Sequence, residues 1–401
     1  MNPRLALLHD YPFQKLARLF ADMEAPAEKT AIKLSVGEPK HPAPEIVLEA
    51  MRENLAQLSV YPLTKGLPEL RESIANWLIR RFGLDSATID PDRHVLPVSG
   101  TREALFSIAQ AVVPAGGSTP PVVIMPNPFY QIYEGASLLA GAEPYYLNTT
   151  ADNGYRMDFS QVPTDILNRT CLVYVCSPGN PAGAVMEPDD YSQLLALADR
   201  HDFVIASDEC YSEIYFAEDH PPAGLLQVAN DLGIKDYHRC LVFHSLSKRS
   251  NLPGLRSGFV AGDGELLTDY LKYRTYHGAT MSNTAQQASI VAWGDEIHVA
   301  ENRALYRAKF DAVLKILGPA MGANQPDAGF YLWPRVPVSD EDFARGLFER
   351  ENVTVLPGSY LSRESRGINP GSHHVRMALV APLEECIDAA QRVQRFMETI
   401  L

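Results

Sequence analysis

Five polar residues between positions 180 and 256 have side chains that together could hold and use an aldehyde cofactor. Lys248 offers a primary amine for a Schiff base, and Asp208 offers a carboxylate for a protonated ring nitrogen. Asn180 and Tyr211 can donate hydrogen bonds to a ring oxygen, and Arg256 can bind a phosphate. A lysine nucleophile with an aspartate for a pyridine nitrogen is what pyridoxal phosphate chemistry requires.

Two of these residues also have ordinary structural roles open to them. A lysine is usually a solvated surface group, but Lys248 follows an apolar run and two serines, Ser245 and Ser247, that could add to a phosphate site. Asp208 ends an apolar run, so it could cap a helix or form a structural salt bridge. A buried carboxylate needs a partner in either case, and a pyridinium nitrogen is a suitable one.

Three further candidates occur outside this group. Gly100, Thr101 and Arg102 open a predicted helix, whose first N–H groups and hydroxyl could bind a phosphate. Tyr130 could stack on a cofactor ring or belong to the core. Arg376 lies inside an apolar strand, where it could clasp a substrate carboxylate or form a structural ion pair.

Short apolar runs alternate with amphipathic segments from about residue 93 onward, which predicts a mostly parallel sheet with helices on both faces. Thr101, Asn180, Asp208 and Lys248 each come soon after a predicted strand. Ligands bind outside the carboxyl ends of the strands in such sheets, so these residues should converge on one edge. The predicted strands are 94–99, 122–125, 170–176, 203–206, 240–243 and 257–261, and the helices between them include 101–113, 129–139 and 188–200.

The pattern changes after about residue 289. Long helical stretches at 298–317, 340–349 and 383–397 flank short strands at 329–333, 353–356 and 375–379, with a long loop over 359–374. We therefore expect three parts: an N-terminal arm over 1–40 that joins the small domain, a large cofactor-binding domain over 41–288, and a small α+β domain over 289–401.

The composition excludes several classes of function. A net charge of −14 argues against nucleic-acid binding. No apolar run approaches the length of a membrane span, and residues 1–20 lack a signal-peptide core, so we expect a cytoplasmic protein without membrane contact. The five cysteines are expected to be buried thiols in a reducing compartment.

Competing motifs are incomplete. Ser245 and Lys248 match the Ser-x-x-Lys of penicillin-binding acyltransferases, but the Ser-Asp-Asn and Lys-Thr-Gly partners are missing. Gly262-x-Gly264 lacks the third glycine of a dinucleotide site. His373 and His374 are adjacent and so cannot bind one metal from a helix face, and we expect no metal.

Over nearly its whole length the chain resembles the fold-type-I pyridoxal phosphate aminotransferases of class I and II. The motifs that carry the resemblance are Ser35-Val36-Gly37-Glu38-Pro39, Tyr61 with Gly66-Leu67-Pro68-Glu69-Leu70-Arg71, Ser99-Gly100-Thr101-Arg102-Glu103-Ala104, Asn180-Pro181-x-Gly183, Asp208-Glu209-x-Tyr211, Ser247-Lys248 with Gly254-Leu255-Arg256, and Val375-Arg376. The family more often has threonine at the position of Ala182.

The resemblance implies a role for each residue. Lys248 would carry the cofactor, Asp208 would pair with its ring nitrogen, and Tyr130 would stack on the ring. Asn180 and Tyr211 would bind the ring hydroxyl. Gly37 and Arg376 would hold the substrate α-carboxylate, and Asn180 would also contact the substrate. The phosphate would be held by Gly100, Thr101, Arg102, Ser245, Ser247 and Arg256, and by Tyr61 of a neighbouring subunit in a homodimer with shared sites.

Within the family, the chain is most similar to the bacterial succinyldiaminopimelate transaminases of lysine biosynthesis, through residues 1–3, 10–13, 37–42 and 367–371. The implied reaction moves an amino group between glutamate and N-succinyl-2-amino-6-oxoheptanedioate. Lys40, Arg363 or Arg366 would then approach the distal anionic end. Alternatives are another class I/II aminotransferase (of aspartate, aromatic or LL-diaminopimelate type), a pyridoxal phosphate β-lyase, and an aminotransferase-like regulator, for which the N-terminal segment is too short to add a DNA-binding module.

Overall fold

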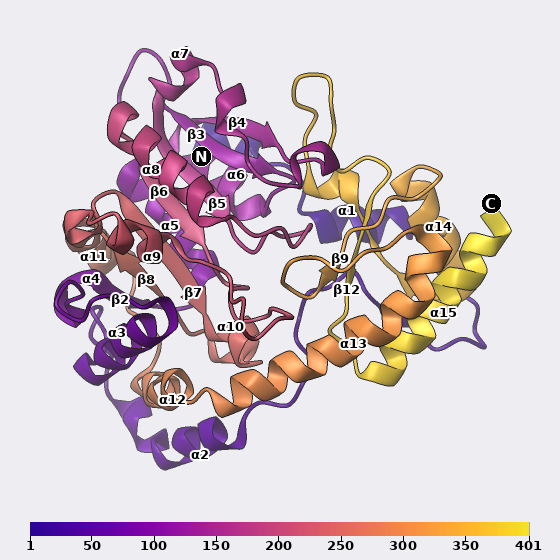
Figure 1. Ribbon diagram of the computed structural model, residues 1–401, viewed down its shortest axis with the longest axis horizontal. Helices are drawn as coiled ribbons and strands as arrows, with labels where there is room; N and C mark the ends of the chain where they lie inside the picture. The colour runs from indigo at the N-terminus through magenta and orange to yellow at the C-terminus, as the bar shows by residue number, and fades with distance from the viewer. Residues whose placement is uncertain (401) are drawn as a thin grey trace.

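A seven-stranded sheet forms the centre of the large domain in the computed structural model, which describes residues 1–400 (Figure 1). The strand order is β2-β8-β7-β6-β5-β3-β4, and all neighbouring strands are parallel except β8, which is antiparallel to both β2 and β7. The predicted mostly parallel sheet is confirmed. The strands are β2 (Val95–Val98), β3 (Val122–Asn127), β4 (Glu143–Asn148), β5 (Thr170–Cys176), β6 (Val204–Asp208), β7 (Cys240–Ser245) and β8 (Gly258–Gly262).

The central strands are apolar on both faces because helices cover both. In β5, Val173 and Val175 face one hydrophobic cluster, whereas Leu172 and Tyr174 face another on the opposite side. Successive side chains of a strand alternate between faces, so a strand buried on both sides becomes a continuous apolar run.

The helices of the large domain begin and end close to sequence signals. For example, α8 starts with Pro188 in its first turn, and α6 ends at Gly141 with a left-handed backbone. The helices are α2 (Glu45–Glu53), α3 (Pro68–Phe82), α4 (Pro91–His94), α5 (Thr101–Val112), α6 (Gln131–Ala140), α7 (Thr164–Leu167), α8 (Pro188–His201), α9 (Leu225–Asp231), α10 (Leu246–Arg249), α11 (Gly264–His277) and α12 (Asn283–Gly294).

A smaller domain follows, built on two short sheets. The first pairs β1 with β10 in parallel, and the second has the antiparallel order β11-β12-β9. Helices α14 and α15 pack on them around a separate hydrophobic cluster. The elements are β1 (Ile32–Lys33), β9 (Tyr331–Leu332), β10 (Val353–Thr354), β11 (Leu356–Pro357), β12 (Val375–Ala378), α14 (Asp340–Glu351) and α15 (Leu383–Ile400).

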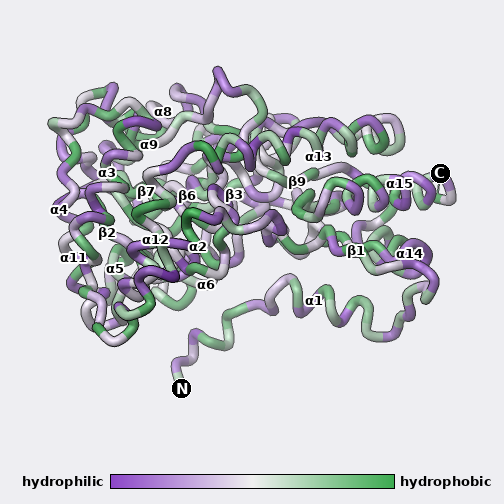
Figure 2. The backbone as a smooth tube through the Cα atoms, turned by 90° about the horizontal axis from the view of Figure 1, so that it is seen from below, coloured by the Kyte–Doolittle hydropathy of each residue, from purple (hydrophilic) through white to green (hydrophobic). Residues whose placement is uncertain are grey.

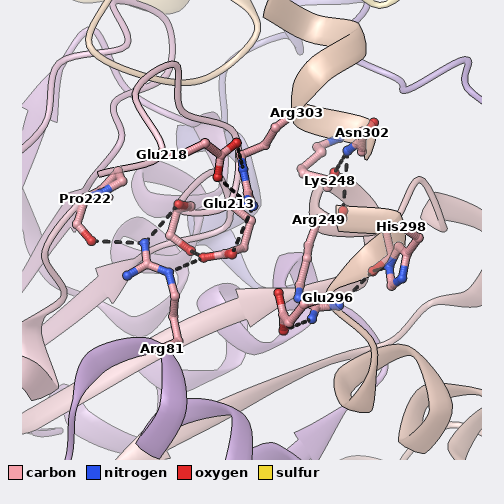
Figure 3. Close-up of polar contacts among 12 residues, drawn as sticks. Arg81, Glu213, Glu218, Pro222, Lys248, Arg249, Glu296, His298, Asn302 and Arg303 are labelled. Atoms are coloured by element: carbon pink, nitrogen blue, oxygen red, sulfur yellow. Dashed lines mark hydrogen bonds and ion pairs between the residues drawn. The ribbon is translucent and has the colours of Figure 1, made fainter. Parts of the chain in front are cut away.

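Helix α13 (Ile297–Met321) connects the two domains (Figure 1). Near its start, Arg303 forms an ion pair with Glu218 of the large domain at 2.8 Å (Figure 3). Farther along, Phe310 and Val313 belong to the small-domain cluster. Residue 288, the predicted end of the large domain, lies inside α12, whose Ala292 and Trp293 still pack in the large-domain core. The chain passes between the domains along α13.

The N-terminal segment extends along one side of both domains (Figure 2). It begins with a 3-10 turn (Pro3–Leu7), which contacts α6. The helix α1 (Pro12–Leu19) follows and contacts β11. Among residues 1–400, no helix has both the length and the apolar character needed to cross a membrane.

Candidate active site

A cavity of about 510 Å³ opens where the carboxyl ends of β2, β5, β6 and β7 meet. Asp208 is the last residue of β6, Ser245 is the last residue of β7, and Thr101 begins the helix after β2. The small domain contributes Tyr331 and Arg376 from β9 and β12. The predicted residues that line the cavity are Gly37, Thr101, Arg102, Tyr130, Asn180, Asp208, Tyr211, Ser245, Ser247, Lys248, Arg256 and Arg376.

Lys248 lies in the single turn of α10, which follows β7 directly. Its Nζ donates a hydrogen bond to the carbonyl of Gly37 at 2.8 Å and lies 5.6 Å from the ring centroid of Phe330. Burial, with smaller contributions from neighbouring charges including Arg376 and Arg256, lowers the pKa of Lys248 to about 8. An amine of this pKa can release and take up a proton near neutral pH, as a nucleophile and proton carrier must.

Asp208 is buried and accepts a hydrogen bond from the Tyr133 hydroxyl at 2.6 Å. Burial raises the pKa of Asp208, and the bond from Tyr133 partly opposes that effect. Among residues 1–400, no lysine or arginine forms an ion pair with this carboxylate. A protonated ring nitrogen would supply the missing positive charge.

The end of the cavity where a phosphate is predicted to bind combines a cation, hydroxyls and a glycine. Arg256 donates to the carbonyl of Pro253 at 2.9 Å, and Ser245 Oγ donates to Ser247 Oγ at 3.0 Å. Gly100 has φ +90°, and a Cβ there would lie 2.1 Å from Arg256 Nη2. Only glycine therefore lets the guanidinium approach the start of α5.

Arg376 lies at the other end of the cavity. Its Nη1 donates to Asn180 Oδ1 at 3.0 Å and its Nη2 donates to the carbonyl of Ser35 at 2.8 Å, while its buried Nε has no hydrogen-bond partner among residues 1–400. Its partners are an amide and a carbonyl, not a carboxylate, so its positive charge can be used by a substrate carboxylate. The backbone of Gly37 packs directly against the Tyr331 hydroxyl, since a Cβ on Gly37 would lie 2.0 Å from Tyr331 Oη. This close packing narrows the cavity beside Arg376.

A further guanidinium, that of Arg102, lies at the mouth of the cavity. Arg102 Nε donates to the Tyr130 hydroxyl at 2.8 Å, and its Nη2 donates to the Tyr11 hydroxyl at 3.1 Å. Both partners are tyrosine hydroxyls, and burial raises the pKa of Tyr130, which keeps that hydroxyl neutral. The N-terminal segment thus covers the mouth and holds a guanidinium there through hydroxyl partners.

The sequence profile of the family "Aminotransferase class I and II" matches residues 29–392. The chain belongs to this family. It is 30% identical to an LL-diaminopimelate aminotransferase of Syntrophobacter fumaroxidans, over 98% of this chain and 97% of that protein. Solved structures agree. An aminotransferase from Neisseria meningitidis is 48% identical with a TM-score of 0.93, over 98% of this chain and 99% of that one. The aminotransferase AspB from Helicobacter pylori is 32% identical with a TM-score of 0.88, over 98% and 99%.

Class I and II aminotransferases use pyridoxal 5'-phosphate, and the residues of this cavity fit it. Among residues 1–400 the buried Asp208 carboxylate has no lysine or arginine partner, Gly100 leaves room for the Arg256 guanidinium, and the buried Lys248 has a lowered pKa. When bound, the cofactor supplies an electron sink for the carbon from which the amino group leaves. Asp208 would keep its ring nitrogen protonated, and Arg256 with the two serines would hold its phosphate.

Asn180 and Tyr211, which the sequence assigns to the ring hydroxyl, have donors left for it. Asn180 uses its Oδ1 for Arg376, which leaves the Nδ2 amide group to donate. The Tyr211 hydroxyl lies 3.0 Å from that of Tyr331, and either can donate in this contact. Burial together with Tyr331 raises the pKa of Tyr211, so the hydroxyl keeps its proton, which is free for the ring oxygen when Tyr331 is the donor.

Other predicted residues lie elsewhere. Tyr61 does not line the cavity, and its side chain is 96% exposed. The prediction that Lys40, Arg363 or Arg366 approaches the substrate finds no support, since none of them lines the cavity. Lys40 pairs with Glu38 at 2.7 Å, Arg363 pairs with the buried Glu134 at 2.6 Å, and Arg366 donates to the Tyr145 hydroxyl at 2.7 Å.

Sequence reasoning missed four residues of the site. Tyr133 supports Asp208, Tyr331 narrows the approach to Gly37, and Tyr11 and Glu38 line the mouth. Only Tyr11 and Glu38 had a local signal, because each lies in a segment already singled out by resemblance.

Proposed function

We propose that this aminotransferase acts on a substrate of the diaminopimelate class, with free LL-diaminopimelate as amino donor and 2-oxoglutarate as acceptor. The observation that carries the proposal is Arg102, a guanidinium at the mouth of the cavity whose side-chain partners are hydroxyls and not carboxylates. The name of the relatives at about 30% identity supports the same substrate.

The charges of the cavity match the two ends of that substrate. Its α-carboxylate would bind Arg376, and its distal carboxylate would bind Arg102 between the two tyrosine hydroxyls. The distal ammonium group needs an anion, and Glu38 lines the same cavity. Its hydrogen bond from Lys40 lowers the pKa of Glu38, which keeps the carboxylate charged.

An N-succinylated diaminopimelate is the second candidate. Residues 367–371, one of the segments similar to the succinyldiaminopimelate group, contribute Ile368, Asn369 and Pro370 to a second cavity of about 560 Å³. Tyr331 lines both cavities, so an extended substrate arm could pass from one to the other. Ala182 also lines the second cavity, where a larger residue would take up space.

The test is a screen of amino donors with 2-oxoglutarate as acceptor, in which the formation of glutamate is measured. LL-diaminopimelate, N-succinyl-LL-diaminopimelate, aspartate and phenylalanine are compared by kcat/KM. Our proposal requires the highest value for LL-diaminopimelate, and a higher value for the succinylated compound selects the second candidate. Aspartate or phenylalanine above both would refute the substrate class.

The variant Arg102→Gln tests whether Arg102 binds the distal carboxylate. The substitution should lower kcat/KM for LL-diaminopimelate by about 10–100-fold, since a charged hydrogen bond is worth about 1.5–3 kcal/mol. The value for alanine, which has no distal carboxylate, should change much less. Equal losses for both substrates would mean that Arg102 serves the cofactor instead.

We further propose that the active unit is a homodimer in which Tyr61 reaches the neighbouring subunit's cofactor phosphate. The apolar side chains of Leu58 and Leu63 are 65% and 70% exposed beside Tyr61, which favours a covered surface. Light scattering should give about twice 44.3 kDa. Tyr61→Phe should weaken cofactor binding by about 10-fold if a phosphate hydrogen bond is lost. A monomeric active enzyme would refute this proposal.

A further inference from the structure

A buried lysine lies outside the cofactor site without a carboxylate to neutralise it. Lys309, in the middle of α13, is 2% exposed, and its ammonium group forms no ion pair with any aspartate or glutamate of residues 1–400. Its hydrogen-bond partners are His41 Nε2 at 2.6 Å and the carbonyl of Val380 at 3.2 Å. A buried unpaired charge is costly, so a chain that keeps one gains something else from it.

The lysine fixes the tautomer of His41. An ammonium group has only donors, so His41 Nε2 must accept and the ring proton must lie on Nδ1. Nδ1 lies 2.8 Å from Asn302 Oδ1, to which it therefore donates. Oδ1 also accepts from Asn251 Nδ2 at 2.9 Å, which fixes the orientation of the Asn302 amide.

Asn302 carries the contact to the catalytic lysine (Figure 3). Its Nδ2 donates to the carbonyls of Lys248 and Arg249 at 3.3 and 3.4 Å. His41 thus ties its own segment to the turn that carries Lys248, through one side chain of α13.

The same segment touches the site at two other points. The carbonyl of Gly37 accepts from Lys248, and the carbonyl of Ser35 accepts from Arg376. A bound cofactor would occupy Lys248, the first donor, and a substrate carboxylate would occupy Arg376, the second. The contact of His41 with Asn302 and Lys309 is the anchor that neither ligand displaces.

We propose that His41 and Lys309 form a positioning pair, which holds residues 35–41 in place for the substrate carboxylate while the cofactor and substrate occupy Lys248 and Arg376. The inference rests on the family's reaction and not on the identity of the amino donor.

The pair also makes carboxylate binding sensitive to acid. Two positive charges 2.6 Å apart repel strongly, so His41 and Lys309 carry one charge between them. Burial and the charge of Lys309 lower the pKa of His41, despite the bond to Asn302. The other groups facing the pair are neutral: Tyr306, whose ring centroid lies 4.8 Å from that of His41, Asn251, and Cys386, whose pKa burial raises. Protonation of His41 at low pH should therefore break the pair and release the segment.

The experiment uses four variants of the cofactor-loaded enzyme and the dicarboxylate maleate as probe. Maleate binding is followed by the absorbance of the bound cofactor from pH 5.5 to 8, and each Kd is expressed for the maleate dianion, because maleate itself takes up a proton in this range. Lys309→Met removes the donor to His41 and should raise the Kd about tenfold at pH 7.5, the effect of about one lost hydrogen bond. Lys315→Gln changes an exposed lysine of the same helix and should leave the Kd unchanged.

Lys309→Gln separates positioning from packing. The amide can donate to neutral His41 or accept from protonated His41, so the Kd at pH 7.5 should stay within about threefold of wild type. The rise in the Kd of Lys309→Gln for maleate between pH 7.5 and 5.5 should be at least about fivefold smaller than the rise in the wild-type enzyme. His41→Phe should resemble Lys309→Met and should also lose the acid rise.

Two results would overturn the inference. One is a Lys309→Met enzyme that binds maleate as tightly as wild type, and the other is an acid rise that Lys309→Gln leaves intact. If Lys309→Met does not fold, Lys309→Gln and His41→Phe decide the question. The KM for glutamate in the first half-reaction is measured alongside. Normal maleate binding without any transamination of LL-diaminopimelate would refute the proposed substrate and leave the positioning pair standing.

Discussion

The lowered pKa of Lys248 makes a prediction that does not need the cofactor. At a pKa of about 8, about half of the Lys248 amines are neutral at pH 8, against about 0.3% for a lysine at the usual 10.5. The cofactor-free enzyme should therefore react at Lys248 with an amine-acylating reagent more than 100-fold faster than the same amine would at its ordinary pKa, if accessibility is equal. The rate should level off above about pH 9, where nearly all of the amine is neutral.

The assay is trace acylation with an anhydride over pH 6–11, with each lysine quantified by peptide mass spectrometry. Exposed Lys315 in the same digest serves as the reference. Burial is the main cause of the shift, and the charge of Arg376 adds to it. Arg376→Met should thus move the inflection to higher pH while keeping it below 10.5. An inflection near 10.5 in the wild-type protein would refute the electrostatic reading of the site.

Four further outcomes follow from the same geometry. Lys248→Ala should show no cofactor attached after borohydride reduction and lose turnover by several orders of magnitude; full transamination would contradict its assignment. Arg376→Ala should weaken maleate binding by about 2–5 kcal/mol, measured by titration, because the substrate carboxylate loses its charged partner; an unchanged Kd would place the carboxylate elsewhere. Lys309→Met should raise the free energy of unfolding at pH 7 by about 1–2 kcal/mol, since removing a buried ammonium outweighs one lost hydrogen bond. Burial lowers the pKa of Lys309 to about 8, so in urea titrations this gain should shrink between pH 8 and 10.5; a gain that persists at pH 10.5 would refute the cause. Gly100→Ala should weaken cofactor binding at least about tenfold in equilibrium dialysis, whereas Gly254→Ala, with open space at its Cβ, should not; equal effects would refute the close-approach argument.

The strands around the cofactor could be predicted because their sequences are apolar on both faces. The runs ending at Asp208 and Ser245 have that character, and their bounds were predicted to within two residues. β4 was missed because it is an edge strand with exposed Glu143 and with Pro144 inside it. α11 was missed because its apolar residues do not follow a clear helical period.

Contacts between distant segments could not be predicted. The loop over 359–374, with Arg363 and Arg366, was predicted to approach a distal carboxylate. Arg363 is instead neutralised by Glu134, 229 residues away in the sequence. Tyr133 supports Asp208 from another helix, and nothing beside it in the chain marks that role. His41 and Lys309, 268 positions apart, meet only because α13 runs between the domains. Such pairings depend on how elements pack, which local patterns do not encode.

The parallel pairing of β1 with β10 has a consequence for how the protein can be truncated or divided into fragments. Leu34 is bonded to both Thr354 and Ala378, so the backbone just before Gly37 is fastened to the C-terminal third of the protein, in addition to its contact with Lys248. Half of the grip on the substrate therefore depends on the small domain. Deleting the first forty residues would remove a strand from that domain as well as the grip itself, and a C-terminal fragment made on its own would need this strand supplied in trans to fold.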